Sequence, residues 1–167
     1  TAEIDQGLAA YRDTGSQTWL PCFLGLQAET YLRAKRPKEG LASVADALAL
    51  SEKTQERCWQ AELNRIKGEL LRALSSNDHA EAECCFSQSL DMSRMQQAKS
   101  WELRAATSLS RLWCDQGKHE AARDLLQPIH GWFTEGIDTP DLREAEALLD
   151  ELDPDGKNWP SPQHCLK

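Results

Sequence analysis

Apolar side chains recur along most of this chain with the spacing of amphipathic helices, and polar or turn-forming residues interrupt the pattern at intervals. Strong helix formers (Ala, Leu, Glu, Gln, Arg and Lys) dominate these segments, whereas runs of Val, Ile and Thr, which favour strands, are absent. The pattern predicts an all-α fold with eight helices, at about 2–13, 17–34, 38–53, 56–74, 79–95, 98–115, 119–133 and 140–152.

Helix-breaking and helix-capping residues stand between these segments. Pro37 is expected to end one helix and begin the next, and Gly117 to close the helix that ends near residue 115. The polar stretch 75–78 predicts a link in which Asp78 is the N-cap of the following helix. Thr139 and Pro140, flanked by acids, predict another helix start.

Three tryptophans divide the chain into similar units. Trp19, Trp59 and Trp101 lie 40 and 42 residues apart, and the residues behind them align as well. Small residues follow each Trp by nine positions and bulky ones by twelve, in the sets Ala28, Gly68, Ser110 and Tyr31, Leu71, Trp113. A period of about 40 residues predicts one helical hairpin per unit, stacked on its neighbours.

The alignment extends to both ends of the chain. Ile4, Gly7 and Leu8 occupy the columns of Val44, Ala47, Leu48 and of Phe86, Ser89, Leu90, so the chain begins in the second half of a repeat and is expected to be a piece of a longer polypeptide. The expected organisation is a repeat domain over 1–152 and a flexible tail, with the units 1–18, 19–58, 59–100, 101–138, a capping helix at 139–152 and the tail at 153–167.

The small residues predict close helix crossings. Ala28, Gly68 and Ser110 are expected to meet a second set of small residues, Gly40, Ala82 and Ala122, where two antiparallel helices approach each other. The three repeat tryptophans open successive first helices at equivalent places, so we expect them to pack on one another as a ladder.

The order small, bulky, turn, small, bulky, small resembles the tetratricopeptide repeat (TPR), best over 68–71 and 113–122, although the period exceeds the usual ~34 residues by about six. Four segments resemble the C-terminal repeats of bacterial signalling proteins in which an adenylate or guanylate cyclase domain precedes a STAND-type ATPase: Glu3–Tyr11, Ala61–Leu74, Gln97–Asp115 and Gly131–Leu152. This resemblance implies a right-handed α-solenoid that binds proteins in the bacterial cytoplasm. It also implies a longer parent chain that makes cyclic nucleotide and binds ATP.

The charge of the chain is concentrated in one segment. The formal net charge is −8, and residues 138–155 carry eight acids against Arg143 alone, a local balance of −7. Neither this segment nor the nearly neutral remainder offers the basic surface that phosphates require, which argues against nucleic acid and membranes as partners. The six cysteines are expected to be reduced thiols in the cytoplasm.

The candidate chemistry points to binding and not to catalysis. The chain has no phosphate-binding GxxxxGK[ST] loop, and its histidines are scattered, so we expect no catalytic, cofactor or metal site. The repeat register places eight polar residues on the inner face of the first helices, namely Glu29, Arg33, Arg65, Glu69, Arg72, Arg104, Ser108 and Arg111.

Arg65, Arg72, Arg104 and Arg111 are expected to form a basic stripe that binds acidic groups of a protein or peptide, or of other domains of the parent chain. Ordinary pairing of Arg65 with Glu69 on one helix explains part of the same pattern. Two alternatives remain: a small-molecule effector pocket between the first helices, and self-association through the face of residues 2–13.

Overall fold

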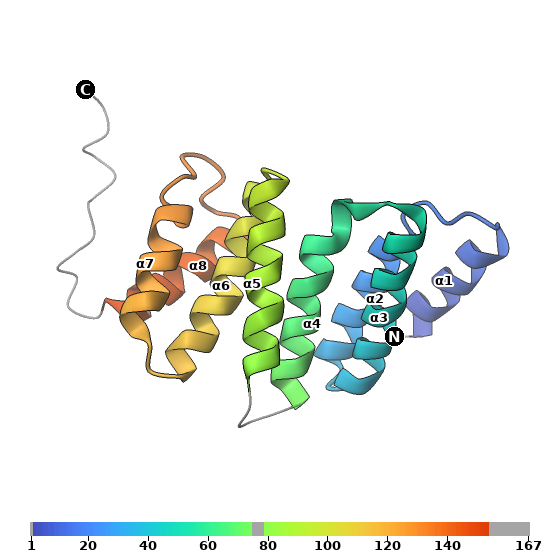
Figure 1. The fold of residues 1–167 in the computed structure, drawn as a ribbon, viewed down its shortest axis with the longest axis horizontal. Helices are drawn as coiled ribbons and strands as arrows, with labels where there is room; N and C mark the ends of the chain where they lie inside the picture. The colour runs from blue at the N-terminus through green and yellow to red at the C-terminus, as the bar shows by residue number, and fades with distance from the viewer. Residues whose placement is uncertain (1, 75–78, 154–167) are drawn as a thin grey trace.

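The computed structural model describes residues 2–74 and 79–153. Within them every regular element is helical, as the sequence predicts (Figure 1). The elements are α1 (Ala2–Asp13), α2 (Leu20–Arg33), α3 (Pro37–Thr54), a 3₁₀ turn η1 (Arg57–Trp59), α4 (Gln60–Leu74), α5 (Ala80–Met95), α6 (Lys99–Asp115), α7 (His119–His130) and α8 (Pro140–Leu152). The expected N-cap at Asp78 and the tail beyond residue 153 lie outside the described residues.

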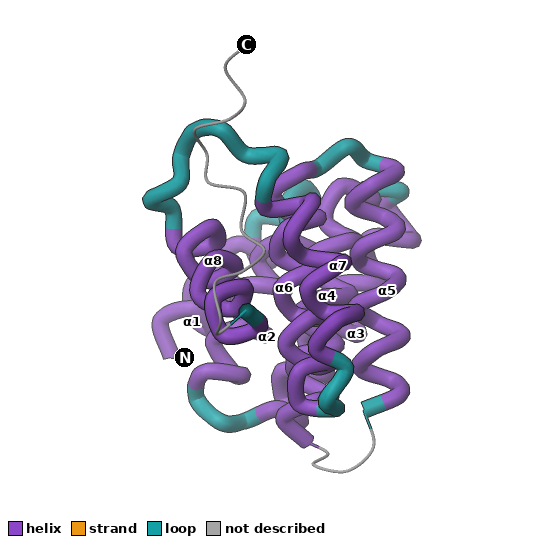
Figure 2. The backbone as a smooth tube through the Cα atoms, turned by 90° about the vertical axis from the view of Figure 1, so that its left-hand side faces the viewer, coloured by secondary structure: helices purple, strands orange, loops and turns teal. Residues whose placement is uncertain are grey.

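The helices are arranged in a row that runs from α1 to α8 (Figure 1). Three antiparallel pairs, α2 with α3, α4 with α5 and α6 with α7, form the body of the row. The first helix of each pair also packs on the first helix of the next pair, and α6 packs on α8 in the same way. Seen along the row, α1, α2, α6 and α8 lie on one side and α3 and α5 on the other (Figure 2).

Two of the three expected pairs of small residues, Ala28 with Gly40 and Ser110 with Ala122, lie at helix crossings, whereas Gly68 lies against Phe86. A methyl group on Gly40 of α3 would be 3.2 Å from the carbonyl oxygen of Ala28 of α2 and 2.4 Å from Leu70 Cδ2. The Ser110 hydroxyl donates to the Ala122 carbonyl, 3.0 Å away. A methyl group on Gly68 would lie 2.5 Å from the fully buried ring of Phe86. Larger side chains at these positions would force the helices apart.

The tryptophan ladder is also present. The ring centroids of Trp19 and Trp59 are 6.0 Å apart, and those of Trp59 and Trp101 are 5.3 Å apart. Each of these two contacts joins tryptophans that occupy equivalent positions of adjacent units in the sequence alignment.

Three expected helix boundaries are wrong by one short turn. The helix expected from residue 17 begins at Leu20, because Trp19 has a left-handed backbone with φ 64°. The helix expected from residue 56 begins with the 3₁₀ turn η1, and the one expected to reach residue 133 ends at His130. Gly117 closes α6 as predicted, with φ 74° and a hydrogen bond from the next amide back to the Trp113 carbonyl.

The core consists of three clusters, each of which extends across a boundary between helix pairs. Its largest cluster extends from Ala82 and Phe86 through α6 and α7 to Leu148 and Leu149 of α8. Two smaller clusters join α1 to α4, around Leu24 and Val44. None of the described helices combines the length and the apolar character that a membrane span requires.

Candidate binding face

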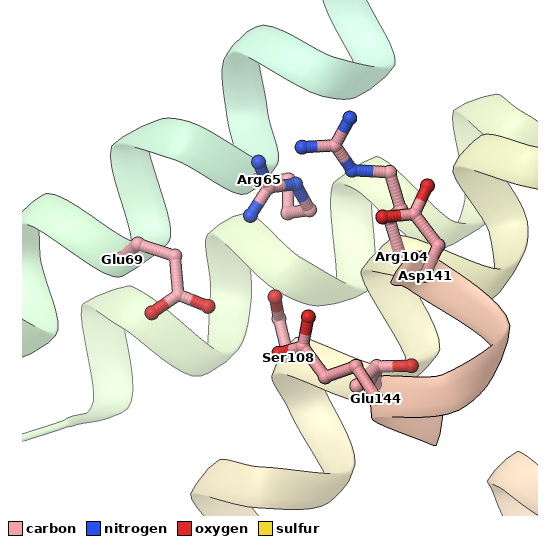
Figure 3. A pocket seen from close by; sticks show the side chains of 7 residues that line it. Arg65, Glu69, Arg104, Ser108, Asp141 and Glu144 are labelled. Atoms are coloured by element: carbon pink, nitrogen blue, oxygen red, sulfur yellow. The ribbon is translucent and has the colours of Figure 1, made fainter. Parts of the chain in front are cut away.

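A small polar hollow lies on the face formed by the first helices and α8, which we call the inner face. The hollow has a volume of about 70 Å³, and its walls come from α4, α6 and α8 (Figure 3). The lining residues are Arg65, Glu69, Arg104, Thr107, Ser108, Asp141 and Glu144. Four of the eight predicted site residues are therefore brought together: Arg65, Glu69, Arg104 and Ser108.

Arg65 lies at the base of this face and is already bound to carboxylates. Its guanidinium donates to both carboxylate oxygens of Glu62, at 2.7 and 3.0 Å, and to Glu29 at 2.9 Å. The Arg65 side chain is only 10 % exposed. These contacts link α2 to α4 below the surface on which a ligand would lie.

The electrostatics of Arg65 follow from this setting. Burial by itself lowers the pKa of the guanidinium, but the hydrogen bonds and charge of Glu62, with the charges of Glu29 and Glu69, raise that pKa above its ordinary value. These carboxylates thus stabilise the charged form of the Arg65 guanidinium. Its main role in this arrangement is to hold the first helices together.

Arg104 completes the cluster from α6. Its guanidinium lies 3.2 Å from the Glu29 carboxylate and 2.9 Å from that of Glu62. Two arginines and two glutamates from α2, α4 and α6 thus alternate across the inner face. The Arg104 side chain is 31 % exposed, so one side of it still faces the hollow.

The remaining two arginines of the expected basic stripe are paired as well. Arg72 lies 3.4 Å from Glu69 and 3.0 Å from Asp115, and Arg111 lies 2.6 Å from Glu144 of α8. Arg33, the last residue of α2, is exposed.

The expectation of a basic stripe is therefore corrected, because carboxylates from neighbouring helices accompany all four arginines. The predicted and newly identified charged residues of the inner face are five arginines (33, 65, 72, 104 and 111) and six acids (29, 62, 69, 115, 141 and 144), which gives 5 − 6 = −1. A face near charge balance does not select acidic ligands by net charge.

Five residues of the inner face were missed by the sequence interpretation: Glu62, Thr107, Asp115, Asp141 and Glu144. Glu62 is three residues before Arg65 on one helix, a spacing that could have signalled the pair. Asp141 and Glu144 gave no such signal, because α8 was expected to present its acids to solvent. They approach Arg104 and Arg111 only because α8 stacks on α6.

A second buried carboxylate lies at the start of α6. The Glu102 side chain is 6 % exposed and accepts hydrogen bonds from Lys99 at 2.7 Å and Arg94 at 3.0 Å. Burial alone raises the pKa of Glu102, but these two hydrogen bonds outweigh it and hold the pKa below its ordinary value. The equivalents of Glu102 in the repeat register are Gln60 of α4 and Leu20 of α2, and neither carries a charge.

Comparison with known proteins gives no family assignment: no protein-family model and no curated protein matches the chain. Among the residues that the structure describes, no three His, Cys, Asp or Glu side chains are grouped so that they could hold a metal ion.

Proposed function

We propose that this chain is a non-catalytic protein-binding module of the tetratricopeptide-repeat type, a right-handed superhelix whose inner face binds a peptide segment. The observation that carries the proposal is the convergence of polar side chains from α4, α6 and α8 on one hollow (Figure 3). Residues 65 and 144 are far apart in sequence, and only the stacking of the first helices brings them to one surface.

The chemistry of the hollow suits a polar, extended peptide. Glu69, Asp141 and Glu144 offer acceptors for peptide N–H groups or a basic side chain, whereas Arg104 offers donors for carbonyl groups. An acidic peptide would have to displace carboxylates that already bind the arginines. We therefore replace the expected acidic ligand by one that carries both donors and acceptors and no strong negative charge.

The alternative of a small-molecule effector site has less support. Pockets for small ligands usually measure about 300–1,000 Å³ and are largely apolar. The hollow between the first helices measures about 70 Å³, and charged or hydroxyl-bearing side chains line it. A volume of this size admits a single side chain or a short stretch of backbone, which favours a peptide.

The nature of the parent protein rests on the sequence resemblance alone. We propose a bacterial, cytoplasmic signalling protein with cyclase or STAND-type ATPase domains. In such a protein the ligand of the inner face would be a segment of those domains or of a separate regulatory protein. This part of the proposal is independent of the local chemistry of the hollow.

Selection from a random peptide library displayed on phage tests the binding function. We expect enrichment of peptides that bind the full chain, and loss of at least about tenfold in affinity, or 1.4 kcal/mol, when Asp141→Lys removes an acceptor and places a cation beside Arg104. Asp141 is in the first turn of α8, so the change in helix stability is only about 0.3–1 kcal/mol.

Glu146→Lys is the matched control, since it makes the same change in charge on the exposed side of α8. It should leave the affinity of the selected peptides unchanged. Peptides that bind both variants equally would show that they recognise another surface, and failure to enrich any peptide would count against the proposed function.

A further inference from the structure

An apolar hollow lies at the other end of the row. It lies between α1 and α2 and has a volume of about 270 Å³. Six residues line it: Ile4, Gly7, Leu8, Tyr11, Phe23 and Leu26. We call it the α1–α2 groove.

A second helix meets the first helix of the next pair at three more places among the described elements, and each time the preceding first helix packs on both of them. The helix α2 packs on both α3 and α4, α4 packs on both α5 and α6, and α6 packs on both α7 and α8. In each case the first helix of a pair covers the line of contact between the second helix of that pair and the first helix of the next pair. Among the described elements, no helix covers the corresponding junction of α1 and α2 (Figure 1).

The equivalent residues show how complete the covering is elsewhere. Leu26 of α2 is 49 % exposed, whereas Ile66, its equivalent in α4, is 3 % exposed. Gly7 of α1 is exposed and a methyl group on it would meet nothing within 4 Å, whereas its equivalents Ala47 and Ser89 are 0 % and 1 % exposed. The α1–α2 groove is thus the uncovered continuation of the interface between repeats.

The way α2 packs on α4 also indicates what shape a helix in the groove must have. Where α2 covers α4, Gly25 faces Leu63 and Ile66, so closely that a methyl group would lie 2.9 Å from Leu63 Cδ2. Leu63 and Ile66 are the equivalents of Phe23 and Leu26 in the repeat register. A helix that fills the groove in the same way needs a residue no larger than glycine or alanine at this contact.

A second copy of the chain does not meet this description. The outer side of α8, at the opposite end of the row, exposes Glu146, Asp150 and Glu151, and burying these acids against an apolar groove would be unfavourable. Two copies placed groove to groove would bring two hollows together and leave both unfilled.

We infer that the α1–α2 groove is the docking site of an amphipathic helix supplied by polypeptide outside residues 1–167. The helix takes the position on α1 and α2 that α2 takes on α3 and α4, with glycine or alanine facing Phe23 and Leu26. This site is separate from the inner-face hollow, and its occupation does not depend on the proposed peptide binding.

An extended chain tests the inference directly. A copy of residues 17–40 placed immediately before Thr1 is in register, because residue 41 is equivalent to residue 1. Covalent linkage makes the local concentration of the added helix high, so that even weak docking is visible. We expect the melting temperature to rise by about 4 °C or more. Amide hydrogen exchange within α1 should slow by at least about tenfold, because the added helix must leave the groove before α1 can open.

The control extension carries Leu24→Glu in the added copy only, because Leu24 of α2 is 2 % exposed where it packs on its neighbours. It should restore the original melting temperature and exchange rates. If the two extended chains behave alike, the groove does not accept an α2-like helix and the inference is overturned.

Sedimentation of the unmodified chain tests whether a second copy of the chain occupies the groove. We expect a monomer, unaffected by Leu26→Glu in the groove or by Ile137→Glu, a matched change at a site that is 67 % exposed. A dimer that Leu26→Glu disperses and Ile137→Glu does not would overturn the inference in favour of a second copy.

Discussion

The two ends of the helix row expose very different surfaces. At one end α8 buries Leu142, Ala145, Leu148 and Leu149 against α6 and α7 and exposes acids on its outer side. At the other end α1 buries only Leu8 and leaves an apolar groove beside α2. Of the two end helices, only α8 combines a buried apolar side with a polar outer side.

The difference teaches that a repeat position does not fix the environment of its side chain. Ile4 is only partly buried, whereas its equivalents Val44 and Phe86 are 1 % and 0 % exposed, because no described helix covers the junction of α1 and α2. The outer side of α8, by contrast, is already polar. The four predictions below test this contrast, from the largest expected effect to the smallest.

Truncation of a leucine should have opposite consequences at the two ends. Leu148→Ala removes a side chain that is 3 % exposed and leaves a cavity in the main core cluster, so it should lower the free energy of unfolding by about 2–5 kcal/mol. Leu26→Ala, at a side chain that is 49 % exposed, should change it by less than about 0.5 kcal/mol. Urea denaturation measures both. Equal losses would show that the α1 end is covered in solution.

Replacement of glycine by alanine should lower stability in the middle of the row and raise it at the α1 end. In Gly68→Ala the new methyl group meets the buried Phe86 ring at 2.5 Å, and the strain exceeds the gain in helix propensity for a net loss of about 1 kcal/mol. In Gly7→Ala the methyl group meets nothing within 4 Å, and α1 should gain about 0.5–1 kcal/mol. Thermal unfolding measures both, and destabilisation by Gly7→Ala would contradict the open groove.

Acid should reduce the contribution that Glu102 of α6 makes to the free energy of unfolding. The pKa of Glu102 is lower in the folded protein than in the unfolded chain, so its contribution is complete above the ordinary glutamate pKa of about 4.3 and is lost as the pH falls through the folded value. Glu102→Gln should therefore destabilise the protein by about 1 kcal/mol at pH 7 and by progressively less below pH ~4. Denaturation curves over this pH range measure the effect, and a constant difference would contradict it.

Substitutions in the tryptophan ladder should have the smallest effect on stability. Trp19 is 52 % exposed and contacts only one ladder neighbour, Trp59, which itself contacts two. Trp19→Phe should therefore cost about 0.5–1 kcal/mol, the value of one aromatic pair. Trp59→Phe disturbs two pairs and should cost about twice as much. The order of the two melting temperatures provides the check.

The sequence was sufficient for features that depend on neighbours in the same hairpin or at the same repeat position. It predicted the helices to within a few residues, the crossings at Gly40 and Ser110, and the packing of Trp19, Trp59 and Trp101. The left-handed backbone of Trp19 was not predictable, since a tryptophan rarely adopts it.

The candidate site could be predicted only in part. The repeat register brought Arg65, Glu69, Arg104 and Ser108 to one face, and the hollow there contains all four. It did not indicate that Glu29 and Glu62 neutralise two of the arginines, or that α8 adds Asp141 and Glu144. These pairings join residues up to 75 positions apart.

The sequence by itself determined the helices, their small and bulky contact positions and the repeat, because these follow from side-chain volume and from hydrophobic spacing along one or two helices. Only the tertiary structure decided which charges meet on the inner face and which repeat position lacks a cover. Both depend on the offset and rotation between successive hairpins, which accumulate along the stack and have no counterpart in the spacing of residues along the chain.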